Sequence, residues 1–258
     1  MSTPAALICV DFACELVYNQ SVRVKGIWVL FLLALPALTG ISPAGIHSWG
    51  FSSSGLRPIS VILRSFPVDP PKSADLDGDG SPETVSIVGA RAVIASGGNP
   101  VWISPQTWQV RSARFADLNR DRRWEVALLV WRPFQPWPID RFLPYGGRIN
   151  GFHNVDGFSC HLVLIGWVGN AYREVWAGSA LAQPLLSIAP ADLDGDGWQE
   201  LVALEGDYDA TLCEPASALT VWGWNGFGFD LLDRQAGRFR SMEVQFDPLG
   251  SAFILTRN

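Results

Sequence analysis

Oxygen-bearing side chains recur at a fixed spacing in two nine-residue segments of this 258-residue chain. They stand at positions 1, 3, 5 and 9 of each segment: Asp75, Asp77, Asp79 and Glu83 in the first, and Asp192, Asp194, Asp196 and Glu200 in the second. Carboxylate oxygens crowded into a tight loop are ligands that Ca²⁺ prefers, and backbone carbonyls and water complete its roughly six to eight oxygens. We therefore predict a calcium site in each segment.

Glycine stands at positions 4 and 6 of both segments: Gly78 and Gly80, then Gly195 and Gly197. Glycine tolerates the positive φ that folds the acids toward one point. Magnesium demands a stricter geometry, and zinc favours His or Cys. An EF-hand shares the D-x-D-x-D-G pattern but needs a bidentate Glu at position 12, where this chain has Ser86 and Ala203. An acidic turn without a metal is the remaining alternative, and in it the carboxylates would repel each other.

A third segment keeps the layout with less negative charge. Its oxygen-bearing residues are Asp117, Asn119, Asp121 and Glu125. Arg120 and Arg122 replace both glycines, and a guanidinium can compensate a carboxylate without any metal. Bulky residues at positive φ also cost on the order of 1 kcal/mol or more. We predict a weaker calcium site here, or a former one in which arginine has replaced the cation.

The three segments belong to an internal repeat. ADLDGDGSPETVSIV (74–88), ADLNRDRRWEVALLV (116–130) and ADLDGDGWQELVALE (191–205) align without gaps. Four strand-like runs follow each motif: 84–88, 91–96, 100–104 and 109–115; 125–131, 161–168, 171–177 and 184–189; 200–205, 218–224, 228–233 and 240–246. Four antiparallel strands in a unit of about 40 residues form the blade of a β-propeller. The pattern predicts an all-β, propeller-like array of four-stranded blades, with an insertion at 133–159.

These motifs resemble those of FG-GAP/VCBS repeat proteins of the bacterial exported type, whose repeats are similar to those of integrin α chains. The similarity covers about residues 56–258. It implies a propeller with calcium loops between its blades and a role in binding or display. Integrin-type propellers have seven blades, whereas this chain shows three clear repeats. The tail 246–256 is a candidate for a degenerate fourth motif, and the run 59–66 is a candidate to close the ring by pairing with it.

The N-terminal region, residues 1–45, has the features of a leader. Arg23 and Lys25 precede sixteen uncharged residues (26–41), which predict an apolar leader helix that is either a cleaved signal peptide or an uncleaved signal anchor. We therefore expect an exported, extracellular or cell-surface protein that touches the membrane only through this leader. An oxidising compartment would permit a Cys160–Cys213 disulfide, and two free thiols are the alternative. The net charge of −6 argues against a nucleic-acid partner.

The sequence carries no recognisable catalytic motif, so we expect no enzyme. Glu205, Asp207 and Asp209 could form a carboxylate pair of the glycosidase kind, although a solvated loop explains them more simply. The insertion is rich in aromatic and arginine side chains, which favours either a recognition surface for a protein or glycan or a lid over the propeller. We predict an exported calcium-binding interaction module. The alternatives are a propeller-scaffold enzyme acting on polysaccharide and a purely structural, membrane-tethered domain.

Overall fold

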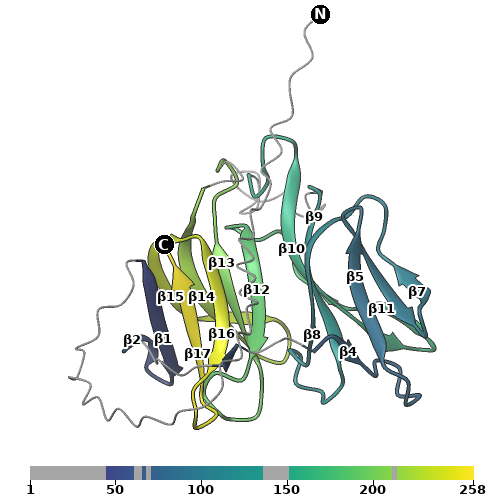
Figure 1. Ribbon diagram of the computed structural model, residues 1–258. Coiled ribbons are helices and arrows are strands. Elements are labelled where there is room, and N and C mark those ends of the chain that lie inside the picture. Colours follow the sequence, from purple (N-terminus) through teal and green to yellow (C-terminus); the bar gives the residue numbers. More distant parts are fainter. Residues whose placement is uncertain (1–44, 61–65, 68–70, 136–150, 211–213) are drawn as a thin grey trace, which may run out of the picture. The chain divides into compact units, whose positions relative to one another are not determined.

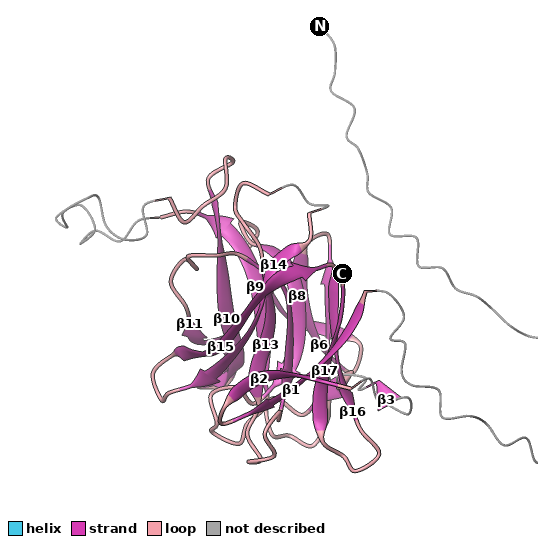
Figure 2. Ribbon diagram, turned by 90° about the vertical axis from the view of Figure 1, so that its left-hand side faces the viewer, coloured by secondary structure: helices cyan, strands magenta, loops and turns pink. Residues whose placement is uncertain are grey.

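The computed structural model describes residues 45–60, 66–67, 71–135, 151–210 and 214–258 (Figure 1). The chain divides into two compact units, Met1–Ile41 and Ser42–Asn258. The first unit, with the predicted leader helix, lies outside the described residues. Within the described ranges the regular structure is entirely β-strand (Figure 2), and they include no helix long and apolar enough to cross a membrane.

The second unit is a four-bladed, propeller-like arrangement of antiparallel sheets, which confirms the predicted fold class. Blade 1 contains β4 (Ser73–Ala74), β5 (Glu83–Val88), β6 (Arg91–Ser96) and β7 (Asn99–Ile103). Blade 2 contains β8 (Gln109–Ala116), β9 (Glu125–Pro133), β10 (Phe158–Val168) and β11 (Ala171–Ala177). Blade 3 contains β12 (Leu185–Ala191), β13 (Glu200–Glu205), β14 (Ala216–Trp224) and β15 (Phe229–Phe239). All twelve strand-like runs of the sequence correspond to strands of the structure.

Blade 4 is assembled from both ends of the unit. It contains β16 (Ser241–Phe246), β17 (Ala252–Arg257), β1 (Ile46–Ser52) and β2 (Gly55–Ile59), with the short β3 (Phe66–Pro67) at the β16 edge. β1 pairs with β17 from Ile46↔Arg257 to Trp49↔Ile254. Of the run 59–66, which was predicted to close the ring, residues 61–65 lie outside the described residues. Phe66 pairs with the tail, opposite Phe246, and Ile59 pairs with Ser48 of β1. The folded unit also includes β1, which lies upstream of residue 56, where the family resemblance begins.

Each acidic segment is the hairpin loop between the first and second strands of one blade. The flanking pairs are Ala74↔Glu83, Ala116↔Glu125 and Ala191↔Glu200. The expectation from the resemblance that these loops lie between blades is therefore wrong. Because the loops occupy equivalent places in their blades, all three lie at the same end of the unit. The 133–159 insertion is the β9–β10 hairpin, so it lies at the opposite end.

Side chains from alternate positions of the central strands pack against different neighbouring blades. In β9, Leu128 belongs to the apolar cluster shared with blade 1, and Leu129 to the cluster shared with blade 3. In β13, Leu201 faces blade 2 and Val202 faces blade 4 in the same way. A strand covered on both faces is apolar along its length, which explains the continuous apolar runs VALLV (126–130) and LVAL (201–204). This packing fixes β9 and β13, the strands that carry the last acids of the middle and third loops.

Part of the insertion is described. The rings of Phe134 and His153 stack at 4.9 Å between centroids, and Phe134 N–H donates to Gly157 O at 2.8 Å. Residues 136–150 lie outside the described ranges, so the choice between a recognition surface and a lid stays a prediction.

Cys160 is a buried free thiol, and burial raises its pKa to about 12. Its predicted alternative partner, Cys213, is outside the described residues.

Candidate metal centres

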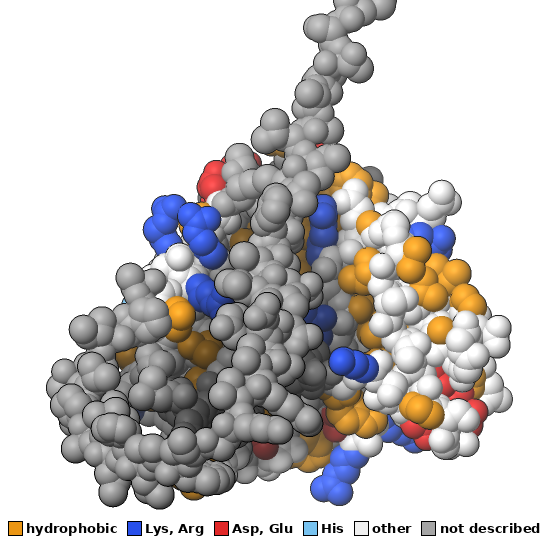
Figure 3. All heavy atoms as spheres, in the orientation of Figure 1, with side chains coloured by type: hydrophobic (Ala, Val, Ile, Leu, Met, Phe, Trp, Pro, Cys, Tyr) orange, Lys and Arg blue, Asp and Glu red, His pale blue; other side chains and the backbone are white. Residues whose placement is uncertain are grey.

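Three acids converge in each of the three loops. The groups are Asp75, Asp77 and Glu83; Asp117, Asp121 and Glu125; and Asp192, Asp194 and Glu200. In every group one oxygen atom from each residue lies within 4.8 Å of the others. A single cation can bridge oxygens at that separation, since Ca²⁺–oxygen distances are about 2.3–2.6 Å. The structure therefore contains acidic clusters that could hold a metal ion. In Figure 3 acidic side chains gather at the foot of the first blade.

The backbone of the first loop is organised by its own carboxylates. Asp75 Oδ1 accepts the N–H of Gly78 at 2.8 Å, and Asp75 Oδ2 accepts that of Gly80 at 3.0 Å. Both glycines have positive φ, +77° and +88°, as the sequence predicted. Asp79 lies outside the converging group, and its Oδ1 accepts the N–H of Ser81 at 2.7 Å. Three of the four predicted ligands of this loop are therefore brought together.

Glu83 supplies the buried side of the first cluster. Its Oε2 accepts the N–H of Leu76 at 2.8 Å. Its Oε1 is buried and has no hydrogen-bond partner among the described residues, and the whole residue is 0% exposed. A buried carboxylate oxygen without a partner is costly, because it has lost water and gained nothing in return. A cation in the loop would satisfy this oxygen, so the donor set fits a bound metal.

The third loop repeats this geometry. Asp192 accepts the N–H groups of Gly195 and Gly197 at 2.8 and 3.0 Å, and Glu200 Oε2 accepts that of Leu193 at 3.0 Å. Asp196 again lies outside the converging group; its Oδ1 accepts the N–H of Trp198 at 2.7 Å.

The third loop differs from the first at the second oxygen of its glutamate. Glu200 is 1% exposed, and its Oε1 lies 3.2 Å from Arg120 Nη2 of the middle loop. Among the described residues Glu83 has no arginine beside it and interacts instead with the buried hydroxyl of Tyr172.

The middle loop keeps the same backbone path without glycine. Arg120 and Arg122 have positive φ, 62° and 66°, at the places where the other loops have glycine. Asp117 accepts the N–H groups of Asp121 and Arg122 at 3.1 and 3.0 Å, and the bond to Arg122 matches that from Gly80 to Asp75 in the first loop. Buried Glu125 has an unpartnered Oε2. The acid geometry has therefore survived the loss of both glycines, at the backbone strain that the sequence predicted.

The arginines of the middle loop contact the third loop. Arg120 pairs with Glu200, and the Cζ atom of Arg122 lies 5.6 Å from the ring centroid of Trp198. Gln199 adds a further link, because its Oε1 accepts the N–H of Asp117 at 2.9 Å. Among the described residues neither guanidinium forms an ion pair with an acid of its own loop. The prediction that they neutralise their own loop is therefore wrong, and no pattern in the sequence indicated the roles of Trp198 and Gln199.

Two of the glutamates have raised pKa values. Burial raises the pKa of Glu125 to about 8, and repulsion by Asp121 and Asp117 adds to the shift. Burial likewise raises the pKa of Glu200 to about 7, where Arg120 opposes the rise only in part. Ionisation of Glu125 and Glu200 is therefore unfavourable in the metal-free protein. A bound cation would favour the ionised forms.

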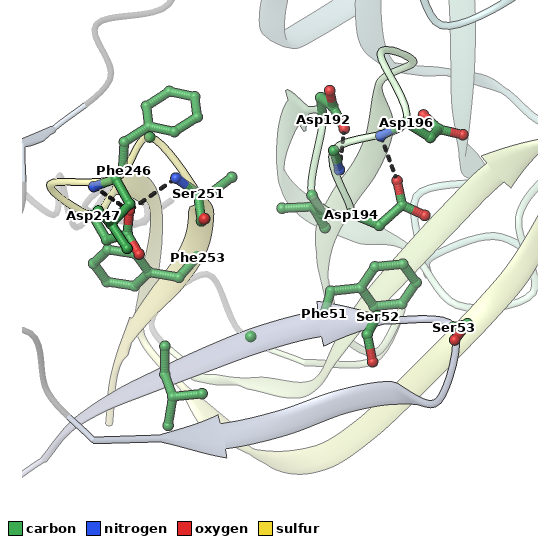
Figure 4. Close-up of a pocket in the computed structure, with 17 residues that line it drawn as sticks. Phe51, Ser52, Ser53, Asp192, Asp194, Asp196, Phe246, Asp247, Ser251 and Phe253 are labelled. Atoms are coloured by element: carbon green, nitrogen blue, oxygen red, sulfur yellow. Dashed lines mark hydrogen bonds between the residues drawn. The ribbon is translucent and has the colours of Figure 1, made fainter.

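The fourth hairpin, between β16 and β17, is a shortened relative of these loops. Asp247 follows β16 as the first Asp follows the corresponding strand in the other blades, and its Oδ1 accepts the N–H groups of Leu249 and Ser251. Ala252 stands opposite Phe246, at the place of the closing glutamate. The tail is thus a degenerate motif, as predicted. A hollow of about 970 Å³ separates it from the third loop, with Phe51 and Ser52 of β1 below (Figure 4).

The acids considered for catalysis have structural contacts. Glu205 is 5% exposed and its Oε2 lies 2.8 Å from Arg234 Nε. Asp207 Oδ1 accepts the N–H of Asp209 at 3.0 Å, as in a local turn. His161 is buried, and its Nε2 lies 2.7 Å from Ser159 Oγ. Burial lowers the pKa of His161 to about 4, so it is neutral at pH 7.

No protein-family model matches the chain, and no curated protein matches its sequence. The propeller-like repeat architecture and the acidic clusters are therefore the features that bear on function.

Proposed function

We propose that the chain is an exported β-propeller-like interaction module whose first and third hairpin loops bind Ca²⁺. The observation that carries the proposal is Glu83, a fully buried glutamate whose Oε1 has no partner and whose neighbours Asp75 and Asp77 converge on the same point. Oxygen-only donors in a glycine-containing loop suit a hard cation. The resemblance of the motifs to FG-GAP/VCBS repeats supports the same reading.

The charge of the loops distinguishes two stronger sites from a weaker one. The segments 75–83 and 192–200 each carry four carboxylates and no basic side chain. The segment 117–125 carries three carboxylates and three arginines, so its formal charge is zero. Cation affinity depends strongly on the number of charged ligands in a site. We therefore assign calcium to the first and third loops, with the middle loop a weaker site.

Calorimetric titration tests the assignment. Protein stripped with a chelator should bind about two equivalents of calcium, and magnesium at equal concentration should bind more weakly because these loops offer few fixed octahedral positions. Absence of binding heat, together with an unchanged melting temperature on adding calcium, would contradict the proposal.

Export is the part of the proposal that rests on the sequence alone. Arg23 and Lys25 before the apolar run 26–41 support it. Fractionation of producing cells should recover the propeller unit outside the cytoplasm. Recovery at full length in the membrane would identify the run as an anchor, and a full-length cytosolic product would refute export.

The partner is proposed to be a protein or glycan that meets the end of the unit opposite the acidic loops. The described part of the 133–159 hairpin supports this, because Phe134 and Phe158 lie there and remain only partly buried. Ca²⁺ at the other end would stabilise the hairpin scaffold and leave this surface free.

A further inference from the structure

Arg120 distinguishes two loops that are otherwise built alike. Glu83 and Glu200 hold the same motif position, and each gives one oxygen to a backbone N–H, of Leu76 and Leu193 respectively. The remaining oxygen of Glu83 has no ion-pair partner among the described residues, where Glu83 otherwise interacts with the neutral hydroxyl of Tyr172, whereas that of Glu200 is held by Arg120 Nη2 at 3.2 Å. The oxygen left to receive a cation is thus free of any positive charge in one loop and already paired with a guanidinium in the other.

The backbone of the middle loop places this guanidinium. Arg120 has φ 62°, a left-handed conformation that is strained for a residue other than glycine. The first loop has Gly78 at the same place, which can send no side chain to a neighbour. The link from Asp117 N–H to Gln199 Oε1, at 2.9 Å, keeps the two loops together beside this contact. Arg120 is itself mostly buried, and its Nε has no partner among the described residues.

We propose that Arg120 is a built-in competitor for the cation of the third loop, which makes the third site weaker than the first. The inference rests on the proposed calcium function. When the ion binds, the Glu200 oxygen must exchange its bond to the guanidinium for a bond to the metal, and two positive charges close to one carboxylate repel each other. The first site requires no such exchange. Occupancy of the third loop is thereby linked to the position of the middle loop.

Single-site proteins make the comparison direct. Glu83→Gln leaves the third loop as the strong site, and Glu200→Gln leaves the first; both also carry Glu125→Gln so that the middle loop contributes little. Titration with calcium chloride should give a dissociation constant about tenfold higher for the third site than for the first, the scale of one charge-assisted hydrogen bond. Adding Arg120→Gly should lower the constant of the third site about tenfold and leave the first site unchanged.

Arg122→Gly is the matched control. It removes an arginine and a positive φ from the same loop, but its guanidinium contacts Trp198 and not Glu200. It should change the third-site constant by less than about twofold, within the range of an exposed charge. Arg120→Asn, which tolerates positive φ and has no charge, should reproduce Arg120→Gly if the guanidinium and not backbone strain is responsible.

The outcomes distinguish failure of the Arg120 inference from failure of the proposed calcium function. If Arg120→Gly leaves the third-site constant unchanged or raises it, Arg120 does not compete with the ion and this inference is overturned while the calcium function stands. If Arg122→Gly matches the effect of Arg120→Gly, the cause is loop strain and the inference is again overturned. If neither single-site protein binds calcium, the proposed function and the inference both fail.

Discussion

The double variant Glu83→Gln, Glu200→Gln is expected to lose the stabilisation by calcium without losing its fold. A ligand that binds only the folded state stabilises it by about 2.7 kcal/mol per site at one hundred times its dissociation constant, so two sites should contribute about 5 kcal/mol. Glutamine keeps the shape of glutamate and an oxygen for the N–H of Leu76 or Leu193, but it removes the charge that attracts the ion.

The metal-free form of the double variant should be about as stable as the metal-free unsubstituted protein, or more so. A fully buried carboxylate with an unpartnered oxygen, as in Glu83, destabilises the fold, and its amide is cheaper to bury. Arg120 can turn toward water once Glu200 is neutral, since its side chain is 28% exposed. The substitutions are therefore predicted to act on the calcium-loaded state.

Glu205→Gln is the matched control for this experiment. Glu205 is also a buried glutamate, but it forms an ion pair with Arg234 and belongs to none of the acidic loops. Its substitution should lower the free energy of unfolding equally with and without calcium. Thermal unfolding of all variants in chelator and in calcium measures both quantities. A double variant that keeps the full calcium-dependent rise in melting temperature would show that the ion binds elsewhere.

The metal-free protein should become less stable as the pH rises from 6.5 to 8. Glu125 and Glu200 have folded-state pKa values of about 8 and about 7, above the ordinary value of 4.5, because they are buried. The folded state therefore holds more protons than the unfolded state in this window, and the free energy of unfolding falls with increasing pH. The expected loss is on the order of 1 to 2 kcal/mol.

His161 sets the lower limit of that window. Its folded-state pKa of about 4 lies below the ordinary 6.5, so its neutral form stabilises the fold above pH 6.5 and this contribution is lost as the pH falls toward 4. Chemical denaturation at several pH values between 6.5 and 8 isolates the glutamates. Glu125→Gln should flatten the slope, and saturating calcium should flatten it further through Glu200. A metal-free protein with pH-independent stability in this range would contradict the assigned burial of these charges.

The repeat made the strands of blades 1 to 3 predictable except β4, but it grouped β8, β12 and β16 with the preceding blade, whereas each is the first strand of the next blade. Each motif marks a hairpin, and alternating or continuous apolar runs mark strands, so the periodicity alone locates β5 to β16. Blade 4 could not be predicted in this way, because its strand β1 carries His47, Ser48 and Gly50 among its apolar residues and follows no acidic motif. Its partner β17 lies more than two hundred residues away, and pairing at that distance leaves no local signal.

The candidate site was predictable in its residues but not in its contacts. Spacing identified the acids that converge, because ligands of one loop must be close in sequence. It also suggested that Arg120 and Arg122 compensate their own loop, since nothing in the chain order indicates that the middle and third hairpins lie side by side. Their contacts with Glu200 and Trp198 depend on the stacking of blades 2 and 3, which is a tertiary property.

Anomalous diffraction from crystals grown with calcium tests the central claim most directly, because it locates the ion itself. The account predicts two strong peaks, one among Asp75, Asp77 and Glu83 and the other among Asp192, Asp194 and Glu200, each about 2.3–2.6 Å from the carboxylate oxygens. A map with no peak at either loop would contradict it, and so would a peak of equal height in the middle loop.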